Sequence, residues 1–390
     1  MRIAQVSPLA EAVPPKFYGG TERVVSWLTE ELMNQGHDVT LFASGESQTS
    51  AKLVECVPRS LRLAGIRDHT ANLLVMIDHV HRRESEFDII HFHVDLLQFS
   101  MFQNLTRKCV TTLHGRLDLP DFYPIYRAFP QMPLVSISDD QRSPLPSTLN
   151  WLATIHHGLP ATACRFNPRG GPYLAFLGRI APEKRPDRAI EIAKRAGIPL
   201  KIAAKVDPVD QNYFDQVIKP QLDDPLIEFI GEIGEHEKTD FLGGAQALLF
   251  PVDWPEPFGL VMIEAMSTGT PVIGWRRGSV PEIIDDGITG AIVETIDGAV
   301  DAIGRVRNIS RLAIRRQFEA RFTASRMARN YLNTYETLLR GGERPQIYVN
   351  SRDAHTEASL ALVSSRTLSE ENIDADYVTK YLSVNSTGSL

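Results

Sequence analysis

Short apolar runs that favour strands alternate with helix-periodic segments almost from the first residue of this chain. Residues 3–6, 39–43, 88–92 and 110–113 are strand-like, and residues 21–35 carry apolar side chains at helical spacing before Gly36. The alternation restarts at Tyr173, after a stretch rich in proline and glycine at residues 160–172. This pattern predicts the α/β fold class, with parallel sheets covered by helices.

The length of the chain favours two domains, because 390 residues are many for one hydrophobic core. We expect an N-terminal domain over residues 1–165 and a C-terminal domain over residues 166–321. A helix at about 322–340 is expected to return to the first domain, and residues 341–390 form a polar tail of unknown role. In the tail, Asp374 and Asp376 match a DxD motif by chance, since no strand precedes them.

Composition narrows the functional class. Hydrophobic residues make up 43% and charged residues 23% of the chain, as in soluble globular proteins. The net charge of −7 argues against nucleic-acid binding. No apolar run reaches the length of a membrane span, and the N-terminus favours a strand over a signal peptide. The three scattered cysteines, without a CxxC pair, favour a cytoplasmic protein with reduced thiols.

Residues 254–281 concentrate the features that suit a binding site. Glu256 stands between two prolines, an apolar helix-like run follows from Phe258 to Met266, and Glu264 comes eight positions after Glu256. The first amides of a helix are unpaired and lie at the positive end of its dipole, so they favour an anion. We therefore expect the amides near Gly259 to face a phosphate, with a carboxylate on each side.

A second candidate segment follows the strand at residues 173–177. The string Gly-Arg-Ile-Ala-Pro-Glu-Lys places Arg179 and Lys184 five residues apart in one loop. An arginine binds phosphate oxygens with a planar fork and a lysine adds a point charge. The pair is therefore suited to a diphosphate.

Together these two segments resemble glycosyltransferase family 4, a family of retaining GT-B glycosyltransferases with an E-x7-E signature. The resemblance covers about residues 1–340 and implies two Rossmann-like domains that face a central cleft. It places a nucleotide-sugar donor mainly on the second domain and the acceptor on the first. By resemblance, Glu256 lies beside the donor sugar and Glu264 holds the nucleotide ribose. Arg179 and Lys184 bind the diphosphate, and the backbone around Ile233 borders the base.

Two segments of the first domain also resemble the family. The string Gly-Gly-Thr-Glu-Arg-Val-Val at residues 19–25 is similar to a glycine-bearing loop that covers the donor phosphates. His114, in Thr-Leu-His-Gly, stands at a strand end where the family has a histidine that contacts the donor sugar. Glu22 and Arg23 suit either an acceptor or an exposed helix start. His91 and His93 share one side of a strand, but the sequence offers no convincing third metal ligand.

The expected activity is retaining transfer of a hexose from a nucleotide-diphosphate sugar to an acceptor hydroxyl. UDP-glucose is the first candidate donor and GDP-mannose the second, and the acceptor is a saccharide, a lipid-linked sugar or a small metabolite. No cofactor is expected, and the two cations are expected to replace a metal. The candidate catalytic residues are Glu256, His114, Arg179 and Lys184. The candidate donor-binding residues are Gly19, Gly20, Arg179, Lys184, Ile233, Glu256, Phe258, Gly259, Leu260 and Glu264.

Several alternatives stay open at this point. A non-catalytic nucleotide-sugar-binding subunit, a GT-B phosphorylase and a nucleotide-sugar epimerase would use similar residues. An NAD-dependent dehydrogenase is disfavoured, because no GxGxxG follows either opening strand. The basic cluster at residues 79–83 suits either weak association with a membrane surface or a solvated helix face, and we favour the second.

Overall fold

The computed structural model describes residues 1–16 and 19–341, so the expected tail lies outside the described residues from residue 342 onward. The chain divides into two compact units. Of the described residues, unit 1 contains 1–16, 19–155 and 328–341, and unit 2 contains 156–327. The boundaries expected from the sequence were 165/166 and 321/322.

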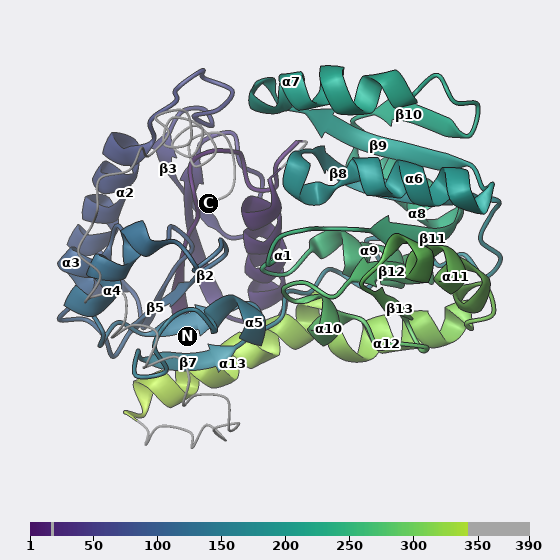
Figure 1. Ribbon diagram of the computed structural model, residues 1–390. Coiled ribbons are helices and arrows are strands. Elements are labelled where there is room, and N and C mark those ends of the chain that lie inside the picture. Colours follow the sequence, from purple (N-terminus) through teal and green to yellow (C-terminus); the bar gives the residue numbers. More distant parts are fainter. Residues whose placement is uncertain (17–18, 342–390) are drawn as a thin grey trace, which may run out of the picture. The chain divides into compact units, whose positions relative to one another are not determined.

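Unit 1 is built on a parallel sheet, of which Figure 1 labels β2, β3, β5 and β7. The sheet has seven strands in the order β3-β2-β1-β4-β5-β6-β7. Strands β1 and β4 form because their apolar residues are buried on both faces of the sheet. The edge strand β3 was not expected from the sequence, because its charged residues Lys52 and Glu55 interrupt the apolar run and lie in solvent. The strands are β1 (Arg2–Val6), β2 (Asp38–Ser44), β3 (Lys52–Val57), β4 (Ile89–Phe92), β5 (Cys109–Thr112), β6 (Leu134–Ser136) and β7 (Trp151–Thr154).

Within residues 1–16 and 19–341, six α-helices accompany this sheet. Helix α1 buries Val24, Val25, Leu28 and Leu32 on one side and ends before Gly36, as its apolar spacing predicts. The last helix begins in the residues assigned to unit 2 and continues into unit 1. The helices are α1 (Gly20–Asn34), α2 (Thr70–Arg82), α3 (Phe99–Phe102), α4 (Tyr123–Ala128), α5 (Asp139–Arg142) and α13 (Ala324–Leu339).

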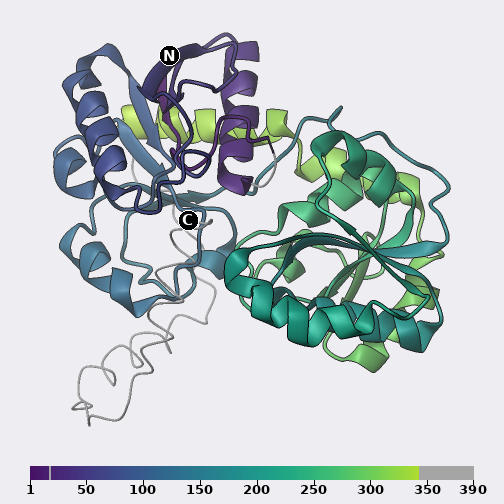
Figure 2. The same ribbon diagram turned by 90° about the horizontal axis from the view of Figure 1, so that it is seen from above.

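Unit 2 is built on a six-stranded parallel sheet with the order β10-β9-β8-β11-β12-β13. Helices cover both of its faces (Figure 2). Its strands are β8 (Tyr173–Ile180), β9 (Leu200–Val206), β10 (Ile227–Gly231), β11 (Ala245–Phe250), β12 (Val272–Trp275) and β13 (Gly290–Val293). Its α-helices are α6 (Pro186–Ala196), α7 (Gln211–Tyr213), α8 (Glu235–Gly243), α9 (Leu260–Thr268), α10 (Val280–Ile283), α11 (Ile296–Val306) and α12 (Arg311–Arg321).

The bounds of α9 correct the helix expected from Phe258 to Met266. The helix begins at Leu260, because Gly259 before it has a φ of +78°, a left-handed conformation that favours glycine. It continues to Thr268, whose hydroxyl and that of Ser267 donate to carbonyls inside the helix. Ser267 and Thr268 therefore belong to α9, although their polar side chains suggested that the helix ends before them.

Each sheet has one point at which the strand order reverses. In unit 1 it lies between β1 and β4, and in unit 2 between β8 and β11. In open parallel sheets, ligands bind beyond the carboxyl ends of the strands at such a point. The loops that follow β8 and β11 contain Lys184 and Glu256, and those that follow β4 and β5 contain His93 and His114.

Candidate functional site

Lys184 and Glu256 meet at the carboxyl edge of the sheet in unit 2. Lys184 ends a short 3-10 helix (Pro182–Lys184) after β8, and Glu256 follows β11. The Lys184 ammonium group forms an ion pair with the Glu256 carboxylate. Glu256 is 8% exposed, so little water screens this pair. The structure thus brings together two of the predicted site residues.

Trp254 completes this cluster and was not predicted as a site residue. Its indole N–H donates to Glu256 Oε2 at 2.8 Å, and Lys184 Nζ lies 4.6 Å from the centre of its ring. The indole therefore orients the carboxylate and also holds the ammonium group by a cation–π interaction. Its place two residues before Glu256, in the same loop, was the only signal in the sequence.

The backbone of Glu256 is held by the loop that follows β12. Ser279 N donates to Glu256 O at 2.9 Å, and Ser279 Oγ donates to Phe258 O at 2.8 Å. Gly278 has a φ of +54°, and a Cβ there would lie 2.3 Å from Glu256 N. Only glycine leaves room for this close approach of two backbone segments.

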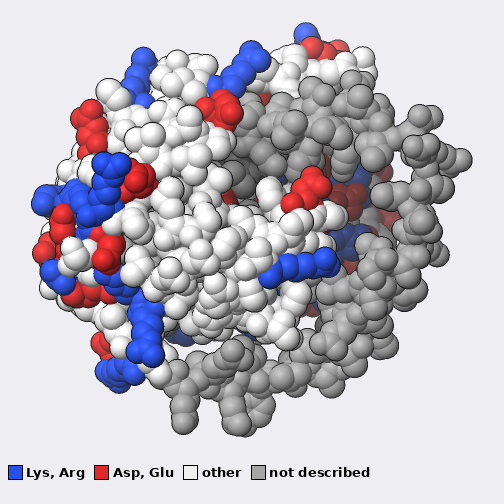
Figure 3. Space-filling model, turned by 90° about the vertical axis from the view of Figure 1, so that its left-hand side faces the viewer, with Lys and Arg blue, Asp and Glu red and all other residues white. Residues whose placement is uncertain are grey.

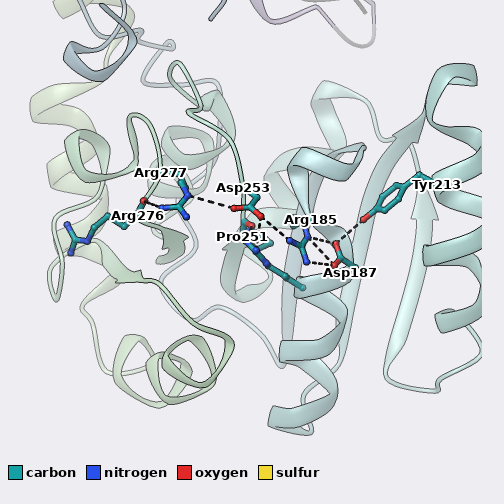
Figure 4. A network of polar contacts seen from close by, with 8 residues as sticks. Arg185, Asp187, Tyr213, Pro251, Asp253, Arg276 and Arg277 are labelled. Atoms are coloured by element: carbon teal, nitrogen blue, oxygen red, sulfur yellow. Dashed lines mark hydrogen bonds and ion pairs between the residues drawn. The ribbon is translucent and has the colours of Figure 1, made fainter. Parts of the chain in front are cut away.

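An ionic network joins the two loops that hold Lys184 and Glu256 (Figure 4). Asp253 accepts hydrogen bonds from Arg185 Nη1 at 3.0 Å and Arg188 Nη2 at 2.8 Å, and its own N–H donates to Glu183 O at 2.8 Å. Burial favours the neutral form of Asp253, but these arginines outweigh it and keep the pKa of its carboxyl group below its usual value.

The same network extends to the neighbouring elements. Arg185 has a φ of +53° and forms hydrogen bonds with Asp187, to which Tyr213 Oη also donates at 2.9 Å. On the other side, Arg277 Nε lies 3.7 Å from Asp253 Oδ1. The loops after β8, β11 and β12 are therefore tied to each other beside the Lys184–Glu256 pair.

Arg179 lies near the end of β8, and its surroundings are acidic. Its guanidinium group donates to Glu183 at 2.6 Å and lies 3.7 Å from both Asp207 and Asp210. Asp207 also pairs with Lys205, at 2.7 Å. A phosphate at Arg179 would have to compete with these carboxylates, so the predicted role of Arg179 stays a prediction.

Glu264 lies in the second turn of α9 and is 4% exposed. Its carboxylate accepts a hydrogen bond from Lys238 Nζ on α8 at 2.7 Å. Gly259 precedes the helix, and a Cβ there would lie 3.4 Å from Glu256 Cγ. The start of α9 thus lies close to one predicted carboxylate and its second turn holds the other. Since buried charges are costly unless paired, both acids carry a lysine partner.

The other donor-binding residues predicted for unit 2 lie on the same edge. Phe258 is buried, Leu260 is half-buried at the first position of α9, and Ile233 is half-buried in the loop between β10 and α8. Their predicted contacts with a nucleotide sugar stay predictions.

In unit 1, Gly19 immediately precedes α1 and Gly20 is its first residue. A Cβ at Gly19 would lie 2.8 Å from Pro15 Cβ, so the glycine lets the loop pack closely. Glu22 accepts a hydrogen bond from the amide of Glu11, and Arg23 donates to Pro15 O. Burial raises the pKa of Glu22 to about 7. Glu22 and Arg23 are both buried and hold the loop, which corrects the picture of an exposed helix start.

His114 follows β5, and its loop is fixed by Gln141. The Gln141 side chain donates to the carbonyls on both sides of His114, those of Leu113 at 2.8 Å and Gly115 at 2.7 Å. His114 Nε2 lies 2.8 Å from His93 Nδ1, and burial lowers the pKa of His114 to about 3. His114 is therefore a neutral, well-positioned side chain at neutral pH.

Asp95, two residues after His93, is a further candidate that the sequence did not reveal. Its φ of +56° is unusual for a residue with a side chain, and burial raises the pKa of its carboxyl group to about 7. Within residues 1–16 and 19–341, no hydrogen bond or ion pair reaches this carboxyl group. Backbone strain and a poorly solvated acid are features of functional loops.

The basic cluster of α2 consists of paired side chains. Arg82 forms an ion pair with Asp78 and Arg83 with Glu86, while His79 and His81 pack against Phe42 and Phe102. On the face shown in Figure 3, coloured basic and acidic side chains are interspersed. These contacts agree with a solvated helix face.

Two features are absent from the part of the chain that the structure describes. Among residues 1–16 and 19–341, no group of three or more histidine, cysteine, aspartate or glutamate side chains has an arrangement that could hold a metal ion. No helix in the same ranges has both the length and the apolar composition needed to cross a membrane.

Two protein families match consecutive parts of the sequence. Residues 18–181 match the family described as Glycosyltransferase Family 4, and residues 165–317 match Glycosyl transferases group 1. Together the matches extend over both units.

Individual relatives agree with these families. A D-inositol 3-phosphate glycosyltransferase of Nocardia farcinica is 32% identical over 44% of this chain and 41% of its own length, so the match spans less than half of that relative. A phosphatidyl-myo-inositol mannosyltransferase of Mycolicibacterium smegmatis is 24% identical over 89% of this chain and 96% of that protein. Among solved structures, the sucrose-phosphate synthase of Thermosynechococcus elongatus matches with a TM-score of 0.71. It is 17% identical, and the match covers 88% of this chain and 100% of that one. This last likeness concerns the fold.

Replacement of Gly278 by alanine should disturb the backbone of Glu256. The new Cβ would overlap Glu256 N, and the positive φ would strain any other residue, so we expect the Gly278→Ala variant to lose about 2 kcal/mol of stability or more. The matched control is Gly304→Ala in α11, where nothing lies within 4 Å and alanine should stabilise the helix by about 0.5–1 kcal/mol. Chemical denaturation of both variants measures the difference, and equal stabilities would contradict the packing described.

Proposed function

The chain belongs to glycosyltransferase family 4, and we propose that it transfers a hexose from a nucleotide-diphosphate sugar to an acceptor hydroxyl, with retention of configuration at the anomeric carbon. The observation that carries this proposal is the cluster of Lys184, Glu256 and Trp254 close to the start of α9. It offers a cation, a carboxylate and the amino-terminal end of a helix at one sheet edge.

The diphosphate of the donor binds at Lys184 and the first amides of α9. Arg179 joins it when a phosphate oxygen replaces Glu183, which is 32% exposed and is the most accessible of its three acidic neighbours. Asp207 and Asp210, which are 6% and 7% exposed, keep the guanidinium group oriented during this exchange. Glu264, held by Lys238, binds the ribose hydroxyls.

Charge separation is the main chemical difficulty of the reaction. The bond from the anomeric carbon to the diphosphate breaks, so negative charge grows on the leaving group and positive charge on the sugar. Lys184, Arg179 and the amides near Gly259 stabilise the diphosphate as fixed electrostatic groups, and Glu256 lies beside the sugar. The acceptor oxygen bonds to the same face of the anomeric carbon, and its proton passes to the departing phosphate. The products are the glycosylated acceptor and a nucleoside diphosphate.

The donor and acceptor are proposed by class. UDP-glucose is the first candidate donor, and the mannosyltransferase among the relatives supports GDP-mannose as the second. The acceptor is a saccharide, a lipid-linked sugar or a small metabolite. The inositol phosphate and phosphatidylinositol in the names of the two relatives support the last two classes. We propose a cytoplasmic protein that associates only weakly with membrane surfaces, because Arg82 and Arg83 are paired with acids.

A screen of nucleotide sugars by thermal melting identifies the donor. A ligand that binds only the folded protein raises its melting temperature, and we expect the largest increase with UDP-glucose or GDP-mannose. The donor that is found is then tested for release of nucleoside diphosphate with and without acceptors. Release that requires an acceptor supports a transferase. Formation of a sugar 1-phosphate from a saccharide and inorganic phosphate would indicate a phosphorylase. Epimerisation of the donor would indicate an epimerase, and tight donor binding without turnover would indicate a non-catalytic subunit.

Loss of the Lys184 ammonium group should slow the reaction. We expect Lys184→Ala to reduce turnover at least a hundredfold, because the leaving diphosphate loses a fixed positive charge. The matched control is Lys201→Ala in β9 of the same unit, whose lysine pairs with Glu228 and lies over Tyr173. Its turnover should stay within about twofold of the original protein. Circular dichroism and melting temperature verify that both variants fold, and near-normal turnover of Lys184→Ala would contradict its role.

The reaction is proposed to need no metal ion, because Lys184 and Arg179 supply the positive charge. Addition of EDTA to the protein, donor and acceptor should therefore leave the initial rate unchanged within about twofold. Restoration of a lost rate by Mg²⁺ or Mn²⁺ would show instead that a divalent cation takes part.

A further inference from the structure

Seven polar side chains form a continuous hydrogen-bonded chain in unit 1, beside the carboxyl edge of its sheet. Except for the half-buried His114, each is at most 2% exposed. The chain connects the sheet with α13, which packs on it through two tyrosines. Its contacts are His114 Nε2 to His93 Nδ1 (2.8 Å), His93 Nε2 to Gln5 Oε1 (2.8 Å), Gln5 Nε2 to Tyr335 Oη (3.4 Å), Tyr335 Oη to His91 Nδ1 (2.7 Å), His91 Nε2 to Thr112 Oγ1 (2.7 Å) and Thr112 Oγ1 to Tyr331 Oη (3.0 Å).

The amide of Gln5 sets the direction of the hydrogen bonds. Its Nε2 donates to Tyr335 Oη, so the tyrosine proton points to His91 Nδ1. Burial holds the pKa of His91 well below its usual value, and the neutral ring therefore carries its proton on Nε2, which donates to Thr112. Every contact on this side then has one donor and one acceptor.

On the other side, Gln5 Oε1 can only accept, so His93 Nε2 must donate to it. His93 is 2% exposed, and a neutral ring costs less to bury than a charged one. A neutral His93 accepts at Nδ1, so His114 must donate from Nε2. A rotated Gln5 amide would reverse each of these bonds and place the proton of His114 on Nδ1.

We propose that this buried chain, from Tyr335 through Gln5 and His93, fixes His114 as the tautomer with its proton on Nε2 and its lone pair on Nδ1. His93, Gln5 and Tyr335 are positioning residues, because they act on a ligand only through His114. With this tautomer, Nδ1 of His114, which is buried in this structure, is a hydrogen-bond acceptor, so its chemistry selects a hydroxyl group of a sugar rather than a phosphate or carboxylate oxygen.

The role of His114 toward a sugar hydroxyl rests on the proposed function, whereas the assignment of its tautomer does not. A histidine that can carry its proton on either nitrogen offers Nδ1 as an acceptor for a hydroxyl proton in only part of the molecules. A fixed tautomer removes that loss, as preorganised groups do in binding sites. The C-terminal helix α13 thereby contributes to the candidate site through Tyr335, without supplying a group that touches the sugar.

The chain offers a matched pair of variants as a test. Tyr335 and Tyr331 lie on the same helix, both are 0% exposed, and their rings pack 6.1 Å apart. Of the two tyrosines, Tyr335 forms the hydrogen bond with Gln5. Tyr331 is the terminal member of the hydrogen-bonded chain and contacts Thr112. The nitrogen signals of His114 in ¹⁵N-labelled protein report its tautomer directly, and His114→Gln assigns them. The same samples are used for melting temperature, for donor-induced stabilisation and for the initial rate of transfer.

We expect the original protein and Tyr331→Phe to show a protonated Nε2 and an unprotonated Nδ1 at His114, and Tyr335→Phe to show a mixture. Transfer should fall about five- to tenfold in Tyr335→Phe, the effect of one weakened hydrogen bond, and less than twofold in Tyr331→Phe. Gln5→Leu removes the same constraint from the side of β1, so its His114 signals and its transfer rate should match those of Tyr335→Phe. It replaces Tyr335→Phe in the test if that variant fails to fold.

A proton on Nδ1, a charged His114 ring, or equal spectra for the two tyrosine variants would overturn the proposed tautomer control. Unchanged transfer in both Tyr335→Phe and Gln5→Leu, with altered His114 signals, would overturn the role toward the sugar hydroxyl. Failure of the proposed function is distinguishable, because the original protein would then show no transfer with any donor and acceptor while its His114 signals could still be read.

Discussion

The ion pair between Lys184 and Glu256 is the interaction on which the candidate site of unit 2 depends. The two residues are 72 positions apart in the chain, and they meet because β8 and β11 are neighbours where the strand order reverses. Strand order alone would bring the loops near each other without fixing their side chains. Trp254 and the Asp253 network supply that precision, since they restrain both the carboxylate and the segment that carries the ammonium group.

The site of unit 2 is built from mutually neutralised charges. Lys184 is paired with Glu256, Lys238 with Glu264, and Arg179 with three carboxylates. Buried ions without partners are costly, so these pairings allow the fold to hold several charges in a poorly hydrated place. A diphosphate that binds here replaces one charged partner with another. In the proposed function, this exchange of partners lets an anionic substrate bind to a protein with a net charge of −7.

Unit 1 uses neutral hydrogen bonds instead. Gln141 fixes the backbone on both sides of His114, and His93 fixes its ring. The tyrosines of α13 form hydrogen bonds with His91 on β4 and Thr112 on β5. Because these hydrogen bonds are continuous from Tyr331 and Tyr335 to His114, the C-terminal helix and His114 are parts of one network.

The sequence by itself determined the alternation of strands and helices, the family, and the loops that contain Glu256, Lys184 and His114. These features are local: apolar periodicity, glycine and proline positions, and short strings that follow strands. It did not reveal the edge strand β3, whose charges hide its pattern, or the two-residue shift of α9, which Gly259 and the hydroxyls of its last turn decide.

Only the tertiary structure decided which side chains are partners. Trp254 orients Glu256, three acids surround Arg179, and Tyr335 contacts Gln5 across 330 positions. These contacts follow from strand order and from packing between elements that are distant in sequence. A local pattern specifies where an element begins and which face it buries. The partner of a buried polar group depends on what packs against that face, and no local pattern records it.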